Sequence, residues 1–268
     1  MTEDPEPAEN ISGGASGGGV EAAFAPDEAG TRAEAVVDRL GERYWQKTYG
    51  GQAAFECLVR TVLSQNTSDT ASQPAHDALM ARYGGDDLAA ALAGADVDRL
   101  ADTIRNAGLY NQKARTLIDL GEHVVEAYGG ADGFDAFVTE TEPAAVRETL
   151  LELNGVGPKT ADCVLLFAGG RAGVFPVDTH VHRIYRRLGI APPDADHEAV
   201  REVLEREVPA AKCGFGHTAS IQFGRDVCTA RRPACLDGPE ACPLYDVCDR
   251  VGVDDVAGEV VDPAETVD

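Results

Sequence analysis

Apolar residues recur every three or four positions along most of the middle of the chain. Phe55, Leu58 and Val62 form one such row, and Val181 and Ile184 belong to another. This spacing places side chains on one face of an α-helix, whereas a half-buried strand would alternate apolar and polar residues. No stretch shows a convincing alternation, so the pattern predicts an all-α fold with short loops.

Both ends of the chain lack such rows. Residues 1–30 are rich in Gly, Ala, Glu and Pro, and residues 253–268 combine acids with few large apolar groups. Segments of this composition bury too little apolar surface to offset the entropy that ordering would cost. We therefore expect a disordered acidic arm at 1–30 and a disordered acidic tail at 253–268.

Hydropathy also bears on location. No apolar run approaches the roughly 18 residues that a membrane-spanning helix needs. The first thirty residues lack the basic and then apolar order of a secretory signal. We expect a soluble, cytoplasmic protein with no membrane partner.

The formal net charge is −23, an unusual value for a protein that must approach phosphates. Residues 1–30 carry seven acidic and no basic side chains, and residues 254–268 carry six and none, which leaves −10 for the middle. A pervasively acidic surface with few lysines suits concentrated salt, which screens self-repulsion. Our hypothesis is a halophilic source, and the alternative is merely an acidic protein.

A tight Gly-x-Gly turn separates two helical runs at 144–168 and carries Lys159 close behind it. Glycines let the backbone turn sharply, and the following helix N-terminus presents unpaired N–H groups with a partial positive charge. Such a hairpin can hold a DNA phosphate without any basic side chain. An ordinary helical hairpin with a solvated lysine would show the same pattern.

Asp178 follows in the segment Pro176-Val177-Asp178-Thr179-His180-Val181, where it is placed to cap the next helix. A plain helix cap is the alternative to a chemical role.

Seven cysteines fall into two groups. Cys57, Cys163 and Cys213 are scattered and are expected to pack as small buried hydrophobes. The remaining four lie within 21 residues, at Cys228, Cys235, Cys242 and Cys248. Because stable disulfides are unusual in an intracellular chain, the cluster predicts a metal site.

These motifs, in this order, resemble endonuclease III, a member of the helix-hairpin-helix DNA glycosylases that carry a Gly/Pro-rich loop and an acidic residue. The resemblance covers about residues 35–250. It rests on Leu-Ser-Gln-Asn-Thr-Ser-Asp at 63–69, Gly-Leu-Tyr-Asn-Gln-Lys-Ala at 108–114, the hairpin at 153–161, the segment 177–183 and the four clustered cysteines.

The resemblance implies a two-lobed helical fold with a C-terminal iron-sulfur cluster loop. One lobe of six helices would comprise residues 50–171 and contain the helix-hairpin-helix. The other would combine residues 31–49 with residues 172–252. Lys159 would come from the first lobe and Asp178 from the second.

The resemblance also implies the chemistry. Lys159 would attack C1′ of the deoxyribose of a damaged nucleotide turned out of the duplex, and Asp178 would stabilise the developing positive charge. A free lysine has a pKa near ~10.4 and is protonated at neutral pH, so the site must favour the neutral amine. The negative charge of Asp178 opposes this, and the sequence does not show how the site balances the two demands.

Further contacts to double-stranded DNA are implied by the same resemblance. Leu109 matches the wedge residue, although it could equally lie in the core, and either Gln65 or Asn66 would fill the gap left by the extruded base. The family usually has its glutamine where this chain has Asn66. Backbone contacts to phosphate would come from Gly155, Val156, Gly157 and Thr160, and arginine contacts from Arg225, Arg231 and Arg232, unless those arginines pair with surface acids.

The four clustered cysteines are spaced Cys-x6-Cys-x6-Cys-x5-Cys. Zinc sites favour pairs two to four residues apart, so a structural zinc is the weaker interpretation. Four thiolates suit a 4Fe-4S cluster. The family has x2 in the middle spacing, so this chain carries four extra residues within 236–241, which leaves the local loop path open.

The sequence thus predicts a monomeric, nucleoid-associated DNA N-glycosylase and abasic-site lyase that removes oxidised pyrimidines. A lysine in the hairpin favours this bifunctional chemistry over that of the adenine glycosylase branch, which has no lysine there. One alternative is a mismatch-specific thymine or uracil glycosylase. Another is a non-catalytic protein that keeps the hairpin and the cluster as a DNA-binding scaffold.

Overall fold

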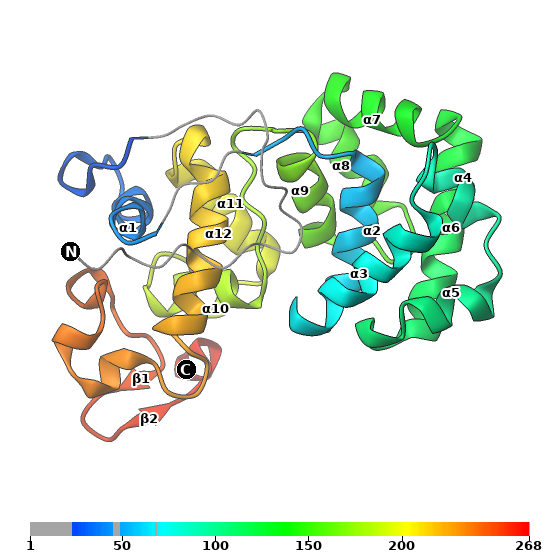
Figure 1. Ribbon diagram of the computed structural model, residues 1–268. Helices are drawn as coiled ribbons and strands as arrows, with labels where there is room; N and C mark the ends of the chain where they lie inside the picture. Colours follow the sequence, from blue (N-terminus) through cyan, green and yellow to red (C-terminus); the bar gives the residue numbers. More distant parts are fainter. Residues whose placement is uncertain (1–22, 45–48, 68, 268) are drawn as a thin grey trace, which may run out of the picture. The chain divides into compact units, whose positions relative to one another are not determined.

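The computed structural model describes residues 23–44, 49–67 and 69–267, and it divides into two compact units (Figure 1). One unit comprises the described residues between 49 and 171. The other joins residues 23–44 to residues 172–267. The described residues are mainly helical, which confirms the all-α prediction. None of their helices is both long and apolar enough to cross a membrane.

The unit of residues 49–171 is a bundle of α-helices joined by short turns. These are α2 (Ala54–Ser64), α3 (Asp69–Tyr83), α4 (Leu88–Ala93), α5 (Val97–Thr103), the 3-10 turn η2 (Arg105–Ala107), α6 (Tyr110–Tyr128), α7 (Ala131–Glu140), α8 (Pro143–Leu151) and α9 (Pro158–Phe167).

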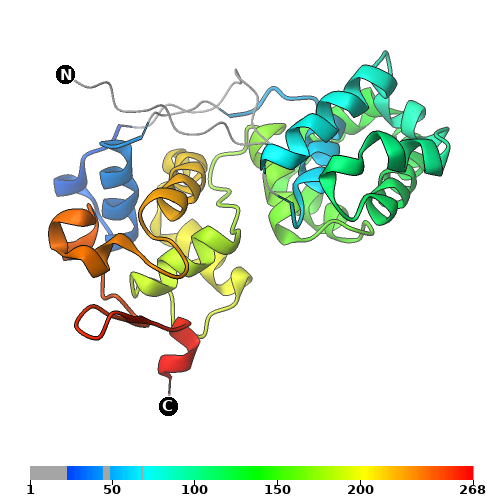
Figure 2. The same ribbon diagram turned by 60° about the horizontal axis from the view of Figure 1, so that its bottom comes forward.

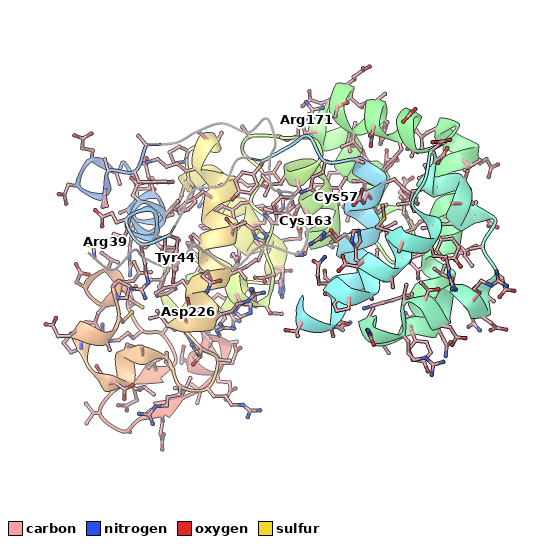
Figure 3. The ribbon with its side chains drawn as sticks, viewed as in Figure 1. Arg39, Tyr44, Cys57, Cys163, Arg171 and Asp226 are labelled. Atoms are coloured by element: carbon pink, nitrogen blue, oxygen red, sulfur yellow. The ribbon has the colours of Figure 1, made fainter. Side chains whose placement is uncertain are left out.

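Helix α2 lies at the centre of this bundle. It packs against α9 and α7, while α6 packs against α4 and α5. Leu58 and Val62 are buried on its apolar face, and the ring of Phe55 meets that of Phe134 edge-on with 6.3 Å between centroids. The end of α7 is closed by Arg171, whose guanidinium donates to three backbone carbonyls of residues 138–141 (Figure 3).

The second unit contains helices from both ends of the sequence. These are η1 (Pro26–Glu28), α1 (Arg32–Gly41), α10 (Thr179–Arg187), α11 (His197–Glu207) and α12 (Ala210–Asp226), followed by the short turns η3 (Ala234–Asp237), η4 (Pro239–Ala241) and η5 (Tyr245–Val247), the two-residue strands β1 (Val253–Asp254) and β2 (Glu259–Val260), and η6 (Pro263–Thr266).

Helices α1 and α12 lie side by side in both views, although about 170 residues separate them in sequence (Figures 1 and 2). The ammonium of Lys212 bridges them, at 2.7 Å from a carboxylate oxygen of Glu34 and 2.7 Å from one of Asp38. Asp38 is fully buried, so this pairing supplies the compensation that a buried carboxylate requires. The first described helix is thereby held to the unit that the C-terminal half builds.

Two expectations about the chain ends need correction. Residues 1–22 of the predicted disordered arm lie outside the described residues, but Phe24 packs against Phe215 with 4.5 Å between ring centroids. At the other end, β1 pairs with β2 in antiparallel register, and Asp262 pairs with the guanidinium of Arg186. Residues 253–267 are therefore not a disordered tail, because backbone pairing and an ion pair supply the contacts that their composition lacks.

Candidate active site and cysteine loop

The hairpin predicted at 144–168 is formed by α8, a turn and α9. Gly155 has φ +84°, and a Cβ added there would lie 2.6 Å from Cγ2 of Thr116, so both conformation and space require glycine. Val156 is buried and anchors the turn. Gly157 caps α9, and a Cβ built on it would meet nothing within 4 Å, so this side of the turn is open.

Lys159 is the second residue of α9 and is half-buried. Cys57 is a fully buried residue of α2. Burial raises the pKa of its thiol, and the nearby positive charge of Lys159 lowers that pKa by a smaller amount. The Cys57 thiol in turn faces the backbone of Cys163, one turn after Lys159 (Figure 3). The lysine therefore stands where α2 and α9 meet, at the N-terminal end of the second hairpin helix.

Gln65 and Asn66, which the sequence could not distinguish, point differently. Nε2 of Gln65 donates to the carbonyl oxygen of Gly155 at 3.0 Å and to Oγ1 of Thr160 at 3.1 Å, so this side chain is turned toward the hairpin. Asn66 is exposed, with φ +51°. The side chain of Thr160 is buried, which leaves only its backbone N–H for the phosphate contact expected of it.

Leu109 lies at the start of α6 and does not join the core. Its side chain is 58% exposed and its φ is +45°. An exposed leucine in the left-handed region has both a solvation cost and a conformational cost, and the packing of the bundle does not account for either.

Asp178 caps α10, as its position in the sequence predicted. Its Oδ1 accepts hydrogen bonds from the backbone N–H groups of His180 and Val181, both at 2.9 Å. Oδ2 accepts no hydrogen bond from the described residues. The carboxylate is half-buried, so the cap holds it in place and leaves one oxygen for another partner. Asp178 and Lys159 belong to different units of the chain.

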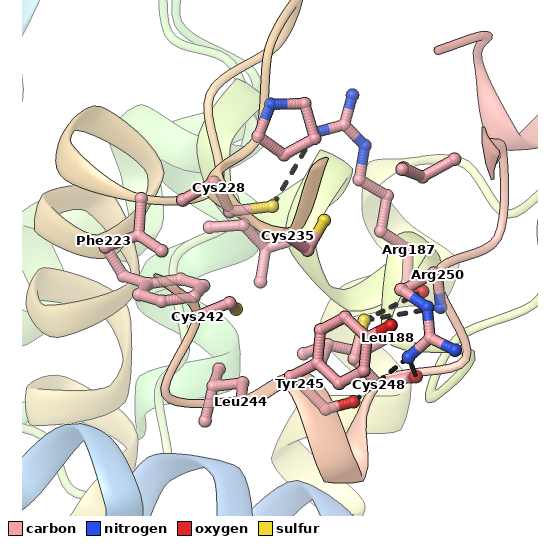
Figure 4. A pocket seen from close by; sticks show the side chains of 15 residues that line it. Arg187, Leu188, Phe223, Cys228, Cys235, Cys242, Leu244, Tyr245, Cys248 and Arg250 are labelled. Carbon is pink, nitrogen blue, oxygen red and sulfur yellow. Dashed lines mark hydrogen bonds between the residues drawn. The ribbon is translucent and has the colours of Figure 1, made fainter. Parts of the chain in front are cut away.

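The four clustered cysteines line one pocket behind the end of α10 (Figure 4). Leu188, Phe223 and Leu244 form its apolar wall, and Arg187 and Arg250 contribute cations. None of the seven cysteines, which all lie among the described residues, forms a disulfide. Cys57, Cys163 and Cys213 are buried away from this pocket, as expected of small hydrophobes.

Cations and N–H groups are directed at the sulfurs in this pocket. Arg187, which is 4% exposed, donates from Nη1 to Sγ of Cys228 at 3.6 Å and from both terminal nitrogens to the carbonyls of Thr229 and Ala230. The backbone N–H of Arg250 donates to Sγ of Cys248 at 3.3 Å. Such donors stabilise thiolates that hold a cluster of net negative charge.

Burial favours the protonated thiols of Cys242 and Cys248 when no metal is bound. It raises the pKa of Cys242 to about 11 and that of Cys248 to about 12. Because iron binds the thiolate, loading the site must release protons. The residues present therefore fit an iron-sulfur cluster in donor type and charge, and they share one pocket. Among the described residues, however, no three such side chains are gathered closely enough to hold a metal ion, so the four sulfurs would have to draw together when the cluster binds.

The sequence analysis missed the arginines of α10. Arg183 donates to the carbonyl oxygen of Cys228 at 2.8 Å, and Arg187 has the contacts described above. The available signal was two arginines one turn apart on a strongly amphipathic helix before the cysteines. Of the arginines expected at phosphate, Arg232 is paired with Asp237 at 2.6 Å, so the alternative of surface ion pairing holds for it.

Comparison with known proteins agrees with both parts of this site. The model of the HhH-GPD superfamily of base excision DNA repair proteins matches residues 59–210. That of the iron-sulfur binding domain of endonuclease III matches residues 228–248, from the first clustered cysteine to the last. Endonuclease III of Thermotoga maritima is 34% identical over 195 residues, which are 73% of this chain and 82% of that protein. The chain belongs to the endonuclease III family.

Other members of the endonuclease III family are similarly close. The Escherichia coli protein is 32% identical over 73% of this chain and 83% of its own. A solved structure of a trapped endonuclease III–DNA covalent intermediate is 28% identical, with a TM-score of 0.68 over 82% of this chain and 96% of that one. A thermostable thymine-DNA glycosylase, 22% identical with a TM-score of 0.66, shares the fold.

Membership in the endonuclease III family makes this chain a DNA glycosylase and abasic-site lyase of base excision repair. It is a DNA-binding protein, and its cofactor is a 4Fe-4S cluster.

Proposed function

We propose that Lys159 is the nucleophile of this glycosylase and lyase, with Asp178 as its acidic partner, and that the damaged bases are oxidised or ring-saturated pyrimidines. The observation that carries the proposal is the half-buried Lys159 in the first turn of α9, directly after the open side of the hairpin. A phosphate held by the hairpin would bring the adjoining sugar to this amine.

The chemistry follows from the amine. Neutral Lys159 forms a bond to C1′ while the glycosidic bond breaks and the base leaves with its electron pair, taking up a proton. The sugar ring opens to a Schiff base. This withdraws electrons, so that loss of a C2′ proton expels the 3′ phosphate by β-elimination. Water then hydrolyses the imine and restores the lysine.

Asp178 would serve the first of these steps. Its carboxylate can stabilise the positive charge that develops on the sugar and can assist proton transfer. The support is the cap geometry, since Oδ1 is held by two backbone N–H groups while Oδ2 is not engaged by the described residues.

The DNA-contacting residues are proposed from the open side of the hairpin and from the exposure of the two loop residues. The backbone of Gly155, Val156, Gly157 and Thr160 would hold a phosphate at the N-terminus of α9. Exposed Leu109 would enter the base stack, and exposed Asn66 would face the orphaned base. Gln65 would stabilise the hairpin through its hydrogen bonds to Gly155 and Thr160.

Cys228, Cys235, Cys242 and Cys248 are proposed as the ligands of the cluster, whose contribution when bound is to cross-link the loop after α12. The support is their common pocket and the match of residues 228–248. Cys242→Ser should abolish the visible absorbance of the cluster in purified protein, whereas Cys213→Ser should retain it. Full absorbance from Cys242→Ser would remove that cysteine from the ligand set.

The preference for oxidised pyrimidines rests on family resemblance, and mismatched thymine or uracil is the competing substrate class. We further propose that the protein acts as a monomer on chromosomal DNA in the cytoplasm, and that its acidity reflects a halophilic archaeal source. Excision from a panel of duplexes containing thymine glycol, uracil or mismatched thymine, at low and high salt, would rank the substrates. Preferential cleavage of the mismatches would overturn our choice.

The central experiment is borohydride trapping with a duplex that contains an abasic site. The intact protein should give a covalent adduct, Lys159→Ala should give none, and the charge-matched control Arg99→Gln, at an exposed position of α5, should behave like the intact protein. An adduct of normal yield from Lys159→Ala would assign the nucleophile elsewhere. Its absence from the intact protein would favour a non-catalytic DNA-binding scaffold.

A further inference from the structure

Among the described lysines, Lys113 alone is almost fully buried, and its hydrogen-bond partners are carbonyl and hydroxyl oxygens rather than carboxylates. It sits in the first turn of α6 and is 4% exposed. Its Nζ lies 2.7 Å from the carbonyl oxygens of Leu63, Gln65 and Ala107, and 3.0 Å from Oγ1 of Thr67. An ammonium has three protons, so the three carbonyls saturate it.

These carbonyls come from two loops. Leu63 and Gln65 end α2 and lead into exposed Asn66, whereas Ala107 ends η2 and leads through Gly108 into exposed Leu109. The hydroxyl of Thr67 also donates to the carbonyl oxygen of Ala107, so the two loops are joined twice at the same point. The loops are defined as residues 63–67 and 105–109.

Both loops have conformations that need external support. Asn66 and Leu109 have φ values of +51° and +45°, which side chains other than glycine rarely adopt. Carbonyls at the end of a helix such as α2 lack hydrogen-bond donors within the helix. A single buried ammonium donates hydrogen bonds to carbonyls of both loops. It thereby satisfies these carbonyls and fixes the distance between the two loops.

The charge needed for this role is present at neutral pH. Burial lowers the pKa of Lys113 to about 8, so the ammonium form still predominates at pH 7. Arginine could not replace it, because a planar guanidinium is larger and directs its donors in a fork.

We propose that Lys113 is a positioning residue for base extrusion. Its ammonium fixes the position of loop 63–67 relative to loop 105–109, so that Asn66 and Leu109 enter the duplex together. The hydrogen bonds of Gln65 to Gly155 and Thr160 also fix loop 63–67 relative to the hairpin that carries Lys159. The inference rests on the proposed DNA roles of Leu109 and Asn66.

The test compares duplex with single-stranded DNA. Lys113→Met keeps the length of the side chain and removes the charge, and Arg115→Met, at an exposed position on the same helix, is the charge-matched control. Lys113→Met should lose about tenfold or more in kcat for excision of thymine glycol from a duplex, because small misplacements of reacting groups have effects of this size. Borohydride trapping on a single-stranded abasic oligonucleotide, where no base must be extruded, should stay within about twofold of the intact protein.

Combined variants separate positioning from general stability. In a Leu109→Ala, Asn66→Ala background, Lys113→Met should add much less than its single effect, because the groups that it positions are gone. Equal losses on both DNA forms, or fully multiplicative effects, would overturn the proposal. Thr67→Val weakens the same junction without removing the cation. It should show the same selective loss to a smaller degree, and it decides the question if Lys113→Met does not fold.

The proposed function fails in a different way. An adduct of normal yield from Lys159→Ala would reject the catalytic assignment. Unchanged duplex excision by the Leu109→Ala, Asn66→Ala protein would reject the DNA roles of those residues. Neither result depends on Lys113.

Discussion

At the scale of single residues, the two glycines of the hairpin have opposite requirements. Gly155 combines φ +84° with a neighbouring side chain 2.6 Å from where a Cβ would lie. Gly157 has φ −96°, which any residue adopts, and has open space beside it. The first glycine is therefore required by the fold, and the second is free to serve the approach of a ligand.

The same substitution at the two positions should separate these requirements. Gly155→Ala should lower the free energy of unfolding by about 1–3 kcal/mol, because it adds backbone strain and a clash with Thr116. Gly157→Ala should leave the thermal unfolding midpoint nearly unchanged and weaken binding to duplex DNA, because its methyl group would crowd a phosphate. Thermal unfolding and fluorescence anisotropy measure the two effects. Equal midpoints for both variants would contradict this account.

At the scale of elements, α10 joins the two chemical features of its unit. Asp178 caps its N-terminus, and Arg183 and Arg187 from its later turns bind backbone carbonyls and a sulfur of the cysteine loop. A cap at one end and a cation-rich face toward the other suit the helix macrodipole. Helix α10 thus holds both a candidate catalytic carboxylate and the loop that follows α12.

Cap and charge can be separated by replacing Asp178 with asparagine. An asparagine at the N-cap keeps the hydrogen bonds to the helix backbone, so Asp178→Asn should change the free energy of unfolding by less than about 1 kcal/mol. Base excision should nevertheless fall by about 100-fold or more, because the carboxylate charge is lost. The matched control is Asp196→Asn, since Asp196 caps α11 in the same way through the N–H of Ala199. Retained excision by Asp178→Asn would limit Asp178 to a capping role.

At the scale of the whole molecule, the charge of −23 sets the conditions for DNA binding. Repulsion between acids destabilises the compact state and opposes the approach of phosphates, and salt screens both. The candidate phosphate site is a helix N-terminus, which needs no basic side chain. An acidic protein can therefore bind DNA at this position while the rest of its surface stays acidic.

Potassium chloride should consequently stabilise this protein. We expect its thermal unfolding midpoint to rise by several degrees between roughly 0.1 M and 2 M KCl, as self-repulsion between acids is screened. Endonuclease III of Escherichia coli, measured in parallel, provides the reference. If the midpoint falls with salt, or rises no more than that of the Escherichia coli protein, the halophilic hypothesis is rejected and the protein is merely acidic.

Several features of this protein were determined by the sequence alone. Helical periodicity indicated the fold class, and the spacing of glycines, Lys159 and Asp178 indicated the hairpin and the helix cap, because these depend on neighbours within a few residues. The four cysteines indicated a metal site by composition and proximity. The order of the motifs identified the family before any contact was known.

Other features were decided only by the tertiary structure, because they depend on residues far apart in sequence. Composition alone made residues 253–267 appear disordered, but an ion pair with Arg186 and strand pairing order them. Gln65 donates to the carbonyl oxygen of Gly155, 90 residues away, and this contact supports our proposal that Asn66 rather than Gln65 faces the orphaned base. In the sequence, Lys113 looks like an ordinary lysine of a helix. Only the folded structure shows that two loops bring three carbonyl oxygens to its ammonium, because the environment of a buried charge depends on residues far away in sequence.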